Sequence, residues 1–205
     1  MANPLYDNLI GKHATNDACF LRQPGKPTVS FRQFSERTSQ VANLLLEHGL
    51  KPGDRVAVQA SKTIEMVILY GATIQAGGVF LSLNTDYKKD EISYFIKDAS
   101  PKIFVCDPQK RIELEDIADQ VASQVLTLDK DGQGSLQSQA NMLSKTFNTI
   151  DRGPDDLVAL LYTSGTTGRS KGAMLTQNNL LSNAKTLKNL WEVNEDDILI
   201  HALPI

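Results

Sequence analysis

Short apolar runs alternate with amphipathic segments along most of this chain, and that alternation restricts the folds open to it. Runs of strand length occur at residues 54–59, 79–83, 102–106 and 125–128. Between and before them, apolar residues recur at helical spacing over residues 35–48, 61–76, 88–98 and 112–122. Strands separated by helices favour a largely parallel sheet with flanking helices. The 205 residues fit a single α/β domain of this kind.

Glycine and hydroxyl residues mark the ends of the expected helices. Gly49 follows the first helix and Gly77 the second, where a left-handed residue commonly closes a helix. Ser61, with Glu65 four residues later, is the expected N-cap of the second helix. These signals agree with the periodicity, so we expect the helix boundaries to lie close to them.

Residues 129–154 break the pattern, because Gly, Ser, Gln and Asn replace most of the apolar residues. We expect a surface excursion within the same domain, with only a short helical turn around residues 143–147. Its first part, residues 129–136, resembles the opening of an EF-hand calcium loop. Ala140 stands where that loop needs a bidentate glutamate, so a simple turn is the better interpretation.

The composition excludes several classes of function. A net charge of −3 and an isoelectric point near 5.6 give no electrostatic reason to expect a nucleic acid partner. Cys19 and Cys106 are far apart, which fits a reducing compartment and argues against a disulfide or a zinc site. No segment has the pattern of a signal peptide, and the apolar stretch 66–76 is too short to cross a bilayer. A cytoplasmic protein without nucleic acid or membrane partners is expected.

A loop rich in glycine and hydroxyl residues follows the apolar run 157–161. It consists of Thr163, Ser164, Gly165, Thr166, Thr167, Gly168, Arg169, Ser170 and Lys171. The glycines let backbone N–H groups approach an anion, and the hydroxyls donate to phosphate oxygens without adding charge. Lys171 supplies a mobile cation. The pattern therefore predicts a binding site for the phosphates of ATP.

This loop differs from the Walker loop of P-loop nucleotidases. Ser170 precedes the lysine where the Walker pattern has glycine, and Gly172 follows it where that pattern has serine or threonine. A second apolar run comes next, at residues 173–175, so the loop joins two strands rather than a strand and a helix. A P-loop ATPase or kinase is disfavoured, and a hairpin loop without a ligand is the structural alternative.

Residues 163–171 match the signature of the adenylate-forming superfamily, which includes acyl- and aryl-CoA synthetases, luciferases and the adenylation domains of peptide synthetases. Two earlier segments, residues 29–34 and 74–84, resemble further motifs of that superfamily in the right order. Within it, residues 169–175 and 200–205 are most similar to malonyl-CoA synthetases. The resemblance implies that this sheet belongs to the large N-terminal domain of such an enzyme.

The resemblance also implies a two-step reaction. A carboxylate attacks the α-phosphorus of Mg·ATP to give acyl-AMP and pyrophosphate, and coenzyme A then displaces AMP to form a thioester. ATP, Mg²⁺, coenzyme A and a small carboxylic acid such as malonate are thus the implied ligands. The alternatives are an aryl- or fatty-acyl-CoA ligase or another adenylating enzyme. From a different class, a non-catalytic module that binds nucleotide polyphosphate is also an alternative.

The end of the chain has the character of an interrupted domain. Residues 197–200 form an apolar run that we expect to be a strand, and His201 opens a motif of the family that contacts substrate, with packing at a strand end as the alternative. The family's adenine site, magnesium-binding glutamate and catalytic lysine have no counterpart here. Residues 1–205 are therefore expected to be the N-terminal part of an AMP-binding domain, inactive alone, with no catalytic residue or metal ligand. We expect the interrupted strand to expose an apolar edge that supports a homodimer.

Overall fold

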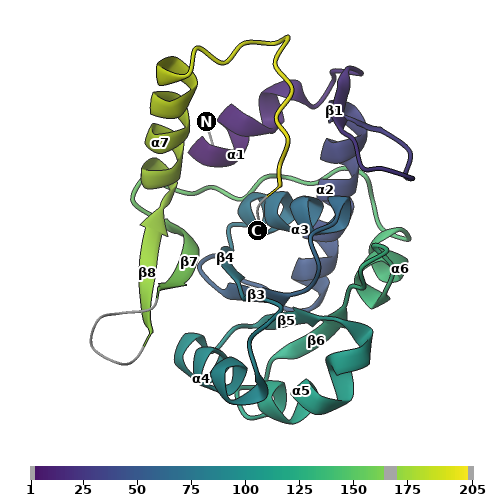
Figure 1. Cartoon of the computed structure of the whole chain (residues 1–205), viewed down its shortest axis with the longest axis vertical. Helices are drawn as coiled ribbons and strands as arrows, with labels where there is room; N and C mark the ends of the chain where they lie inside the picture. The colour runs from purple at the N-terminus through teal and green to yellow at the C-terminus, as the bar shows by residue number, and fades with distance from the viewer. Residues whose placement is uncertain (1–2, 164–169, 203–205) are drawn as a thin grey trace.

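Six strands form the central sheet of the computed structural model, which describes residues 3–163 and 170–202 (Figure 1). In chain order they are β3 (Arg55–Gln59), β4 (Val79–Ser82), β5 (Ile103–Cys106), β6 (Gln124–Thr127), β7 (Leu157–Thr163) and β8 (Lys171–Thr176). Across the sheet they are arranged β6-β5-β3-β4-β7-β8. β8 runs antiparallel to β7, whereas the other neighbouring pairs are parallel. The predicted α/β class with a largely parallel sheet is confirmed.

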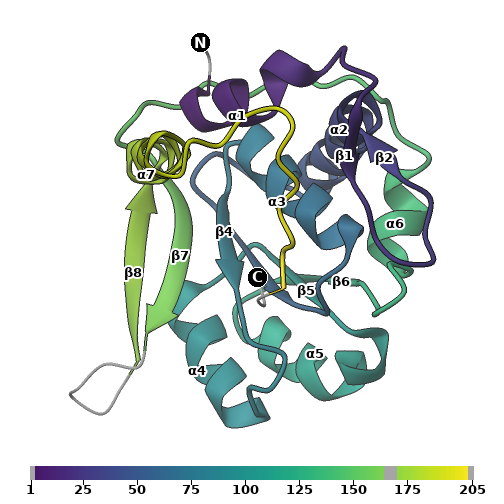
Figure 2. The ribbon, with the colours of Figure 1, turned by 45° about the horizontal axis from the view of Figure 1, so that its top comes forward.

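Helices cover both faces of this sheet, which gives three layers (Figures 1 and 2). One face carries α2 (Phe31–Glu47) and α3 (Ile64–Gln75), and the other carries α4 (Lys89–Ala99) and α5 (Arg111–Asp119). On β3, Val56 and Val58 pack into the first core cluster and Ala57 into the second. In the register of the sheet, Val56 pairs with Phe80 of β4 and with Ile103 of β5. A strand buried on both faces needs a continuous apolar run, which explains the runs in the sequence.

The predicted helix ends are confirmed at their C-termini, and one N-cap differs. Gly49 and Gly77 adopt φ angles of +78° and +74° directly after α2 and α3. α3, however, begins after Thr63, whose hydroxyl accepts a hydrogen bond from the Met66 N–H at 3.2 Å. The expected cap at Ser61 is therefore wrong, because an N-cap side chain bonds the backbone only two or three residues ahead of it.

The N-terminal elements pack along α2 and the last helix, with the first helix beside the last one and the small strand pair beside α2 (Figure 2). They are α1 (Pro4–Leu9), the 3₁₀ turn η1 (Gly11–His13) and a small antiparallel pair, β1 (Cys19–Leu21) with β2 (Val29–Ser30). Leu5 of α1 packs with Val158 of β7 and with Leu181 of α7, which spans Gln177–Leu190. The start of the chain therefore supports the strand pair β7–β8.

Residues 129–154 differ from their prediction in where their helix lies and in how that helix packs. Their helix is α6 (Ser135–Ala140), and residues 143–147 contain no helical turn. Leu136 and Ala140 of α6 are buried in the first core cluster. The rest of the segment is held by side-chain amides of α2: Gln40 donates to the carbonyls of Asn141 and Leu143. Residues 141–154 include no buried residue, so the expected surface excursion is confirmed there, whereas α6 is a packed part of the domain.

The C-terminal residues also differ from their prediction. Residues 198–202 follow α7 as an extended segment without strand pairing, so the strand expected at residues 197–200 is wrong. Ile198, Leu199 and Ile200 are each more than 80% exposed. A strand needs a hydrogen-bonding partner, and none of the described residues offers one at this place.

Candidate functional site

The two ends of the predicted phosphate loop form the open end of the β7–β8 hairpin. Thr163 is the last residue of β7, Lys171 is the first of β8, and the two are paired in the register. Ser164, Gly165, Thr166, Thr167, Gly168 and Arg169 lie outside the described residues. The loop therefore joins two antiparallel strands, as the sequence predicts, rather than a strand and a helix.

The parallel sheet fixes where this hairpin opens. β7 pairs with β4 through Phe80–Ala159 and Leu81–Leu160 in the parallel sense. Thr163 accordingly lies on the same side of the sheet as the carboxyl ends of β3, β4 and β5. In open α/β sheets, ligands bind at this carboxyl edge. The loop predicted to hold phosphate is therefore at the edge where the fold places a ligand.

Polar side chains organise the neighbouring strand ends on this edge. The Gln59 amide, at the end of β3, donates to the carbonyls of Asn84 and Tyr87 at 3.0 and 3.2 Å. The side-chain carbonyl oxygen of Asn84 accepts a hydrogen bond from the Asp86 N–H at 3.0 Å. Asn84 therefore shapes the loop after β4.

Helix α4 contacts both ends of the phosphate loop. The Tyr94 hydroxyl donates to the carbonyl of Ser170 at 2.9 Å, and the Tyr162 hydroxyl donates to the carboxylate of Asp98. The Phe95 ring packs on the Tyr162 ring with centroids 4.5 Å apart. Burial, reinforced by the hydrogen bond to Asp98 and its negative charge, raises the pKa of Tyr162. Tyr162 therefore stays protonated and remains a donor at neutral pH.

Lys171 is available to an anion. It is exposed and forms no ion pair with any residue in the described ranges. Its position at the start of β8 ties its backbone to Thr163, while its side chain makes no hydrogen bond or ion pair with residues 3–163 and 170–202. A lysine of this kind acts as a point charge for phosphate.

His201 lies apart from the hairpin. Its carbonyl accepts a hydrogen bond from the Lys62 ammonium at 2.6 Å, and its side chain is exposed. No hydrogen bond or ring contact joins His201 to Thr163, Ser170 or Lys171 in the described structure. The expectation that His201 contacts substrate therefore remains a prediction.

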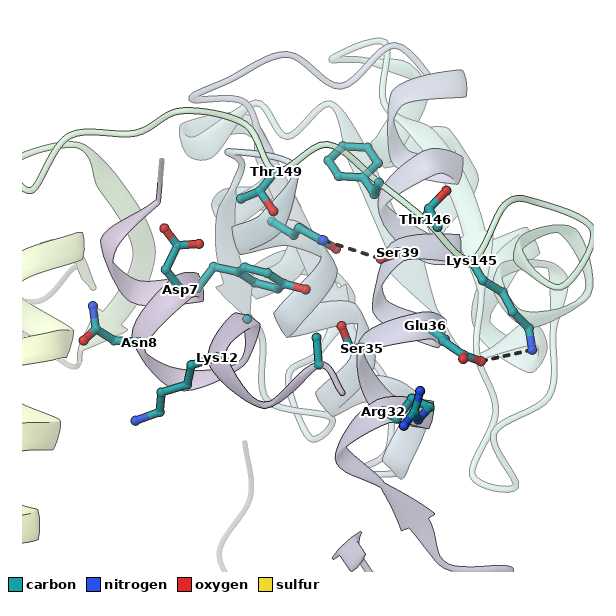
Figure 3. A pocket seen from close by; sticks show the side chains of 15 residues that line it. Asp7, Asn8, Lys12, Arg32, Ser35, Glu36, Ser39, Lys145, Thr146 and Thr149 are labelled. Atoms are coloured by element: carbon teal, nitrogen blue, oxygen red, sulfur yellow. Dashed lines mark hydrogen bonds and ion pairs between the residues drawn. The ribbon is translucent and has the colours of Figure 1, made fainter. Parts of the chain in front are cut away.

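A polar cleft that the sequence did not indicate lies between α1, α2 and residues 145–149 (Figure 3). It has a volume of about 750 Å³. Three of its charged side chains are in ion pairs, Lys145 with Glu36 at 3.0 Å and Arg32 with Asp17 at 2.6 Å, and Asp7 and Lys12 also line it. No signal in the sequence marks such a cleft, since its walls come from three separate segments.

The remaining candidate groups offer no second reactive site. Cys106 is fully buried, and burial raises the pKa of its thiol to about 11, so it is a poor nucleophile at neutral pH. The Asp129 carboxylate accepts the N–H groups of Asp131 and Gln133, which makes the predicted turn of this segment. No helix within residues 3–163 and 170–202 is long and apolar enough to cross a membrane.

Comparison with known proteins identifies the family. The sequence model of AMP-binding enzymes matches residues 11–205. The chain belongs to the AMP-binding enzyme family. This finding confirms the resemblance to adenylate-forming enzymes that residues 163–171 carry.

Individual AMP-binding enzymes agree with this assignment. MatB from Rhodopseudomonas palustris, solved both without ligand and with ATP, superimposes with a TM-score of 0.95 at 49–50% identity, over 98% of this chain and 40% of MatB. Oxalate–CoA ligase of Arabidopsis thaliana is 30% identical over 98% of this chain and 40% of its own length. Tyrocidine synthase 2 of Brevibacillus parabrevis is 38% identical over 72% of the chain and 4% of its own length. The chain thus spans two fifths or less of these relatives.

Proposed function

We propose that this chain is the N-terminal portion of an ATP-dependent carboxylate–CoA ligase that activates malonate or a similar small dicarboxylate. The observation that carries the proposal is the match to MatB, at 49% identity over 98% of the chain. The sequence resemblance of residues 169–175 to malonyl-CoA synthetases supports the same substrate class. The match to an oxalate–CoA ligase adds support, since oxalate is also a short dicarboxylate.

In this proposal the hairpin binds the phosphate end of ATP. The carboxylate attacks the α-phosphorus, the bond to the bridging oxygen of the β-phosphate breaks, and pyrophosphate leaves with the negative charge. Lys171, with the hydroxyl and backbone donors predicted for the loop, stabilises that charge as it develops. The ATP-bound structure of MatB supports the use of ATP by a protein of this fold.

Mg²⁺ and coenzyme A belong to the proposal through the family resemblance. Residues 3–163 and 170–202 contain no group of three His, Cys, Asp or Glu side chains that could hold a metal ion. Mg²⁺ is usually held by one or two carboxylates together with substrate phosphates, so we assign no step to the ion. Because the chain spans two fifths of MatB, we propose that it has no activity when isolated.

The test is ATP–pyrophosphate exchange by the full-length protein that contains this chain, assayed with malonate, methylmalonate, benzoate, a fatty acid and a set of amino acids. We expect exchange with the dicarboxylates. Lys171→Ala should lower the rate of that exchange roughly 100-fold, which is the effect of losing one hydrogen-bond donor to a developing negative charge. Thioester formation from supplied acyl-AMP should change much less, since pyrophosphate has already left.

Lys145→Ala is the matched control, because Lys145 is an exposed lysine that pairs with Glu36 away from the hairpin. Unchanged exchange in Lys171→Ala would contradict the assigned role. Exchange with an amino acid alone would favour a peptide-synthetase adenylation domain, which the tyrocidine synthase match makes the second candidate. If none of the acids supports exchange, a non-catalytic module that binds polyphosphate is the remaining candidate function.

A further inference from the structure

The open end of the β7–β8 hairpin has little support from the sheet. β7 pairs with β4 only as far as Leu160. In the described part of the chain, β8 is therefore the only strand beside Leu161, Tyr162 and Thr163. On β8, residues 171–174 are exposed. A hairpin end of this kind needs another element to fix its position, since an isolated two-stranded ribbon is marginally stable in water.

Helix α4 supplies that support through a single turn. Tyr94 and Asp98 are four residues apart, so their side chains lie on the same face of the helix. Tyr94 bonds the carbonyl of Ser170, directly before Lys171. Asp98 accepts from Tyr162, directly before Thr163. One turn of one helix therefore contacts both strands at the residues adjoining the phosphate loop.

Helix α4 is itself fixed to the sheet. Ile92, Phe95 and Ile96 are buried in the second core cluster. At its C-terminus, the Arg55 guanidinium of β3 donates to the carbonyls of Ala99 and Ser100 at 2.6 and 2.9 Å. The position of α4 is thus set by the core, and the two hydrogen bonds transmit that position to the hairpin.

We infer that Tyr94 and Tyr162 are positioning residues, which hold the two ends of the phosphate loop in place for ATP. The inference rests on the proposed function and adds two residues to it. Donors that stabilise a leaving pyrophosphate must be in place before charge develops. If their anchors are lost, part of the binding energy of ATP is used to order the hairpin, so ATP binds more weakly.

The hydroxyls can be separated from the ring packing. Tyr94→Phe and Tyr162→Phe each remove one hydroxyl and keep the ring that contacts Phe95. Tyr87→Phe is the matched control, because Tyr87 also contacts Phe95 with ring centroids 5.0 Å apart. In the described structure the Tyr87 hydroxyl makes no hydrogen bond to the hairpin. Asp98 is exposed, so its loss of a partner leaves no buried charge.

The experiment measures exchange kinetics and melting temperature of the full-length protein and these three variants. We expect Tyr94→Phe to raise the KM for ATP about fivefold, the effect of losing one neutral hydrogen bond. Tyr162→Phe should raise it at least as much, because the Tyr162 hydroxyl donates to a carboxylate. The KM for the dicarboxylate and the melting temperature should stay near the wild-type values. Tyr87→Phe should leave all three quantities unchanged.

A second measurement does not depend on activity. Amide hydrogen exchange of residues 170–176 should be faster in Tyr94→Phe than in the wild type and in Tyr87→Phe. If the wild type is active and both test variants keep its KM for ATP, the inference is overturned and the proposed function stands. An equal rise in both KM values with a lower melting temperature would also overturn it. If the wild type is inactive, the proposed function fails, and unchanged hydrogen exchange would then reject the positioning role too.

Discussion

Thr63 shows how one side chain sets the start of a helix. Its hydroxyl accepts the Met66 N–H at 3.2 Å, and the residue is only 4% exposed. Thr63→Ala should therefore lower the free energy of unfolding by about 1 kcal/mol, as loss of an N-cap does. Urea unfolding of the 205-residue chain measures this. Ser61→Ala, two residues earlier and outside the cap, is the control and should have no measurable effect.

The difference between Ser61 and Thr63 also shows what a residue pattern can and cannot predict. Both are hydroxyl residues in front of the same apolar run, and local sequence does not tell which of them adopts the extended backbone of an N-cap. Gly49 and Gly77 were predictable because a positive φ favours glycine. Equal urea midpoints for Thr63→Ala and the wild type would contradict the assignment of Thr63 as the cap.

At the scale of elements, α6 is a core helix in a segment with the composition of a loop. Only two of its six residues are apolar, Leu136 and Ala140, and they are 1% and 2% exposed. Leu136→Ala should lower the free energy of unfolding by about 3 kcal/mol, because it opens a cavity in the first core cluster. Met142→Ala, at a position that is 78% exposed, is the control for the same segment. A loss below 1 kcal/mol in Leu136→Ala, measured by urea unfolding, would show that α6 is not packed as described.

The elements that the sequence predicted are those whose signals are local. Repeated apolar runs and helical periodicity identified four parallel strands and the helices between them. The phosphate-binding role of the glycine-rich loop remains a prediction. Helix α6 was missed because six residues with two apolar side chains carry too little periodicity. The strand expected at residues 197–200 was wrong, since an apolar run becomes a strand only where a partner edge is present. The anchors of the loop were out of reach for a similar reason, as 76 residues separate Tyr94 from Ser170.

At the scale of the whole molecule, β6 and β8 are the two edge strands of the sheet, and β8 is the edge that carries a strongly exposed apolar side chain. β8 is the last strand in the sheet order, so one side of its backbone has no strand partner among the described residues. Met174 on this strand is 66% exposed, and Leu161 of β7, which pairs with Ala173, is 42% exposed. Unpaired backbone groups next to apolar side chains form a template for pairing with a second copy.

We therefore expect the isolated 205-residue chain to self-associate through β8, with a mass that rises with concentration in sedimentation equilibrium. Met174→Lys should shift the chain toward the monomer, because a charge on an edge strand opposes pairing. Ile112→Lys is the matched control, since Ile112 is 87% exposed on α5 and lies away from this edge. A monomeric wild-type chain at high concentration would reject the pairing. Equal weakening by both substitutions would instead assign the association to general surface hydrophobicity, because a specific β8 contact responds only to the change on β8.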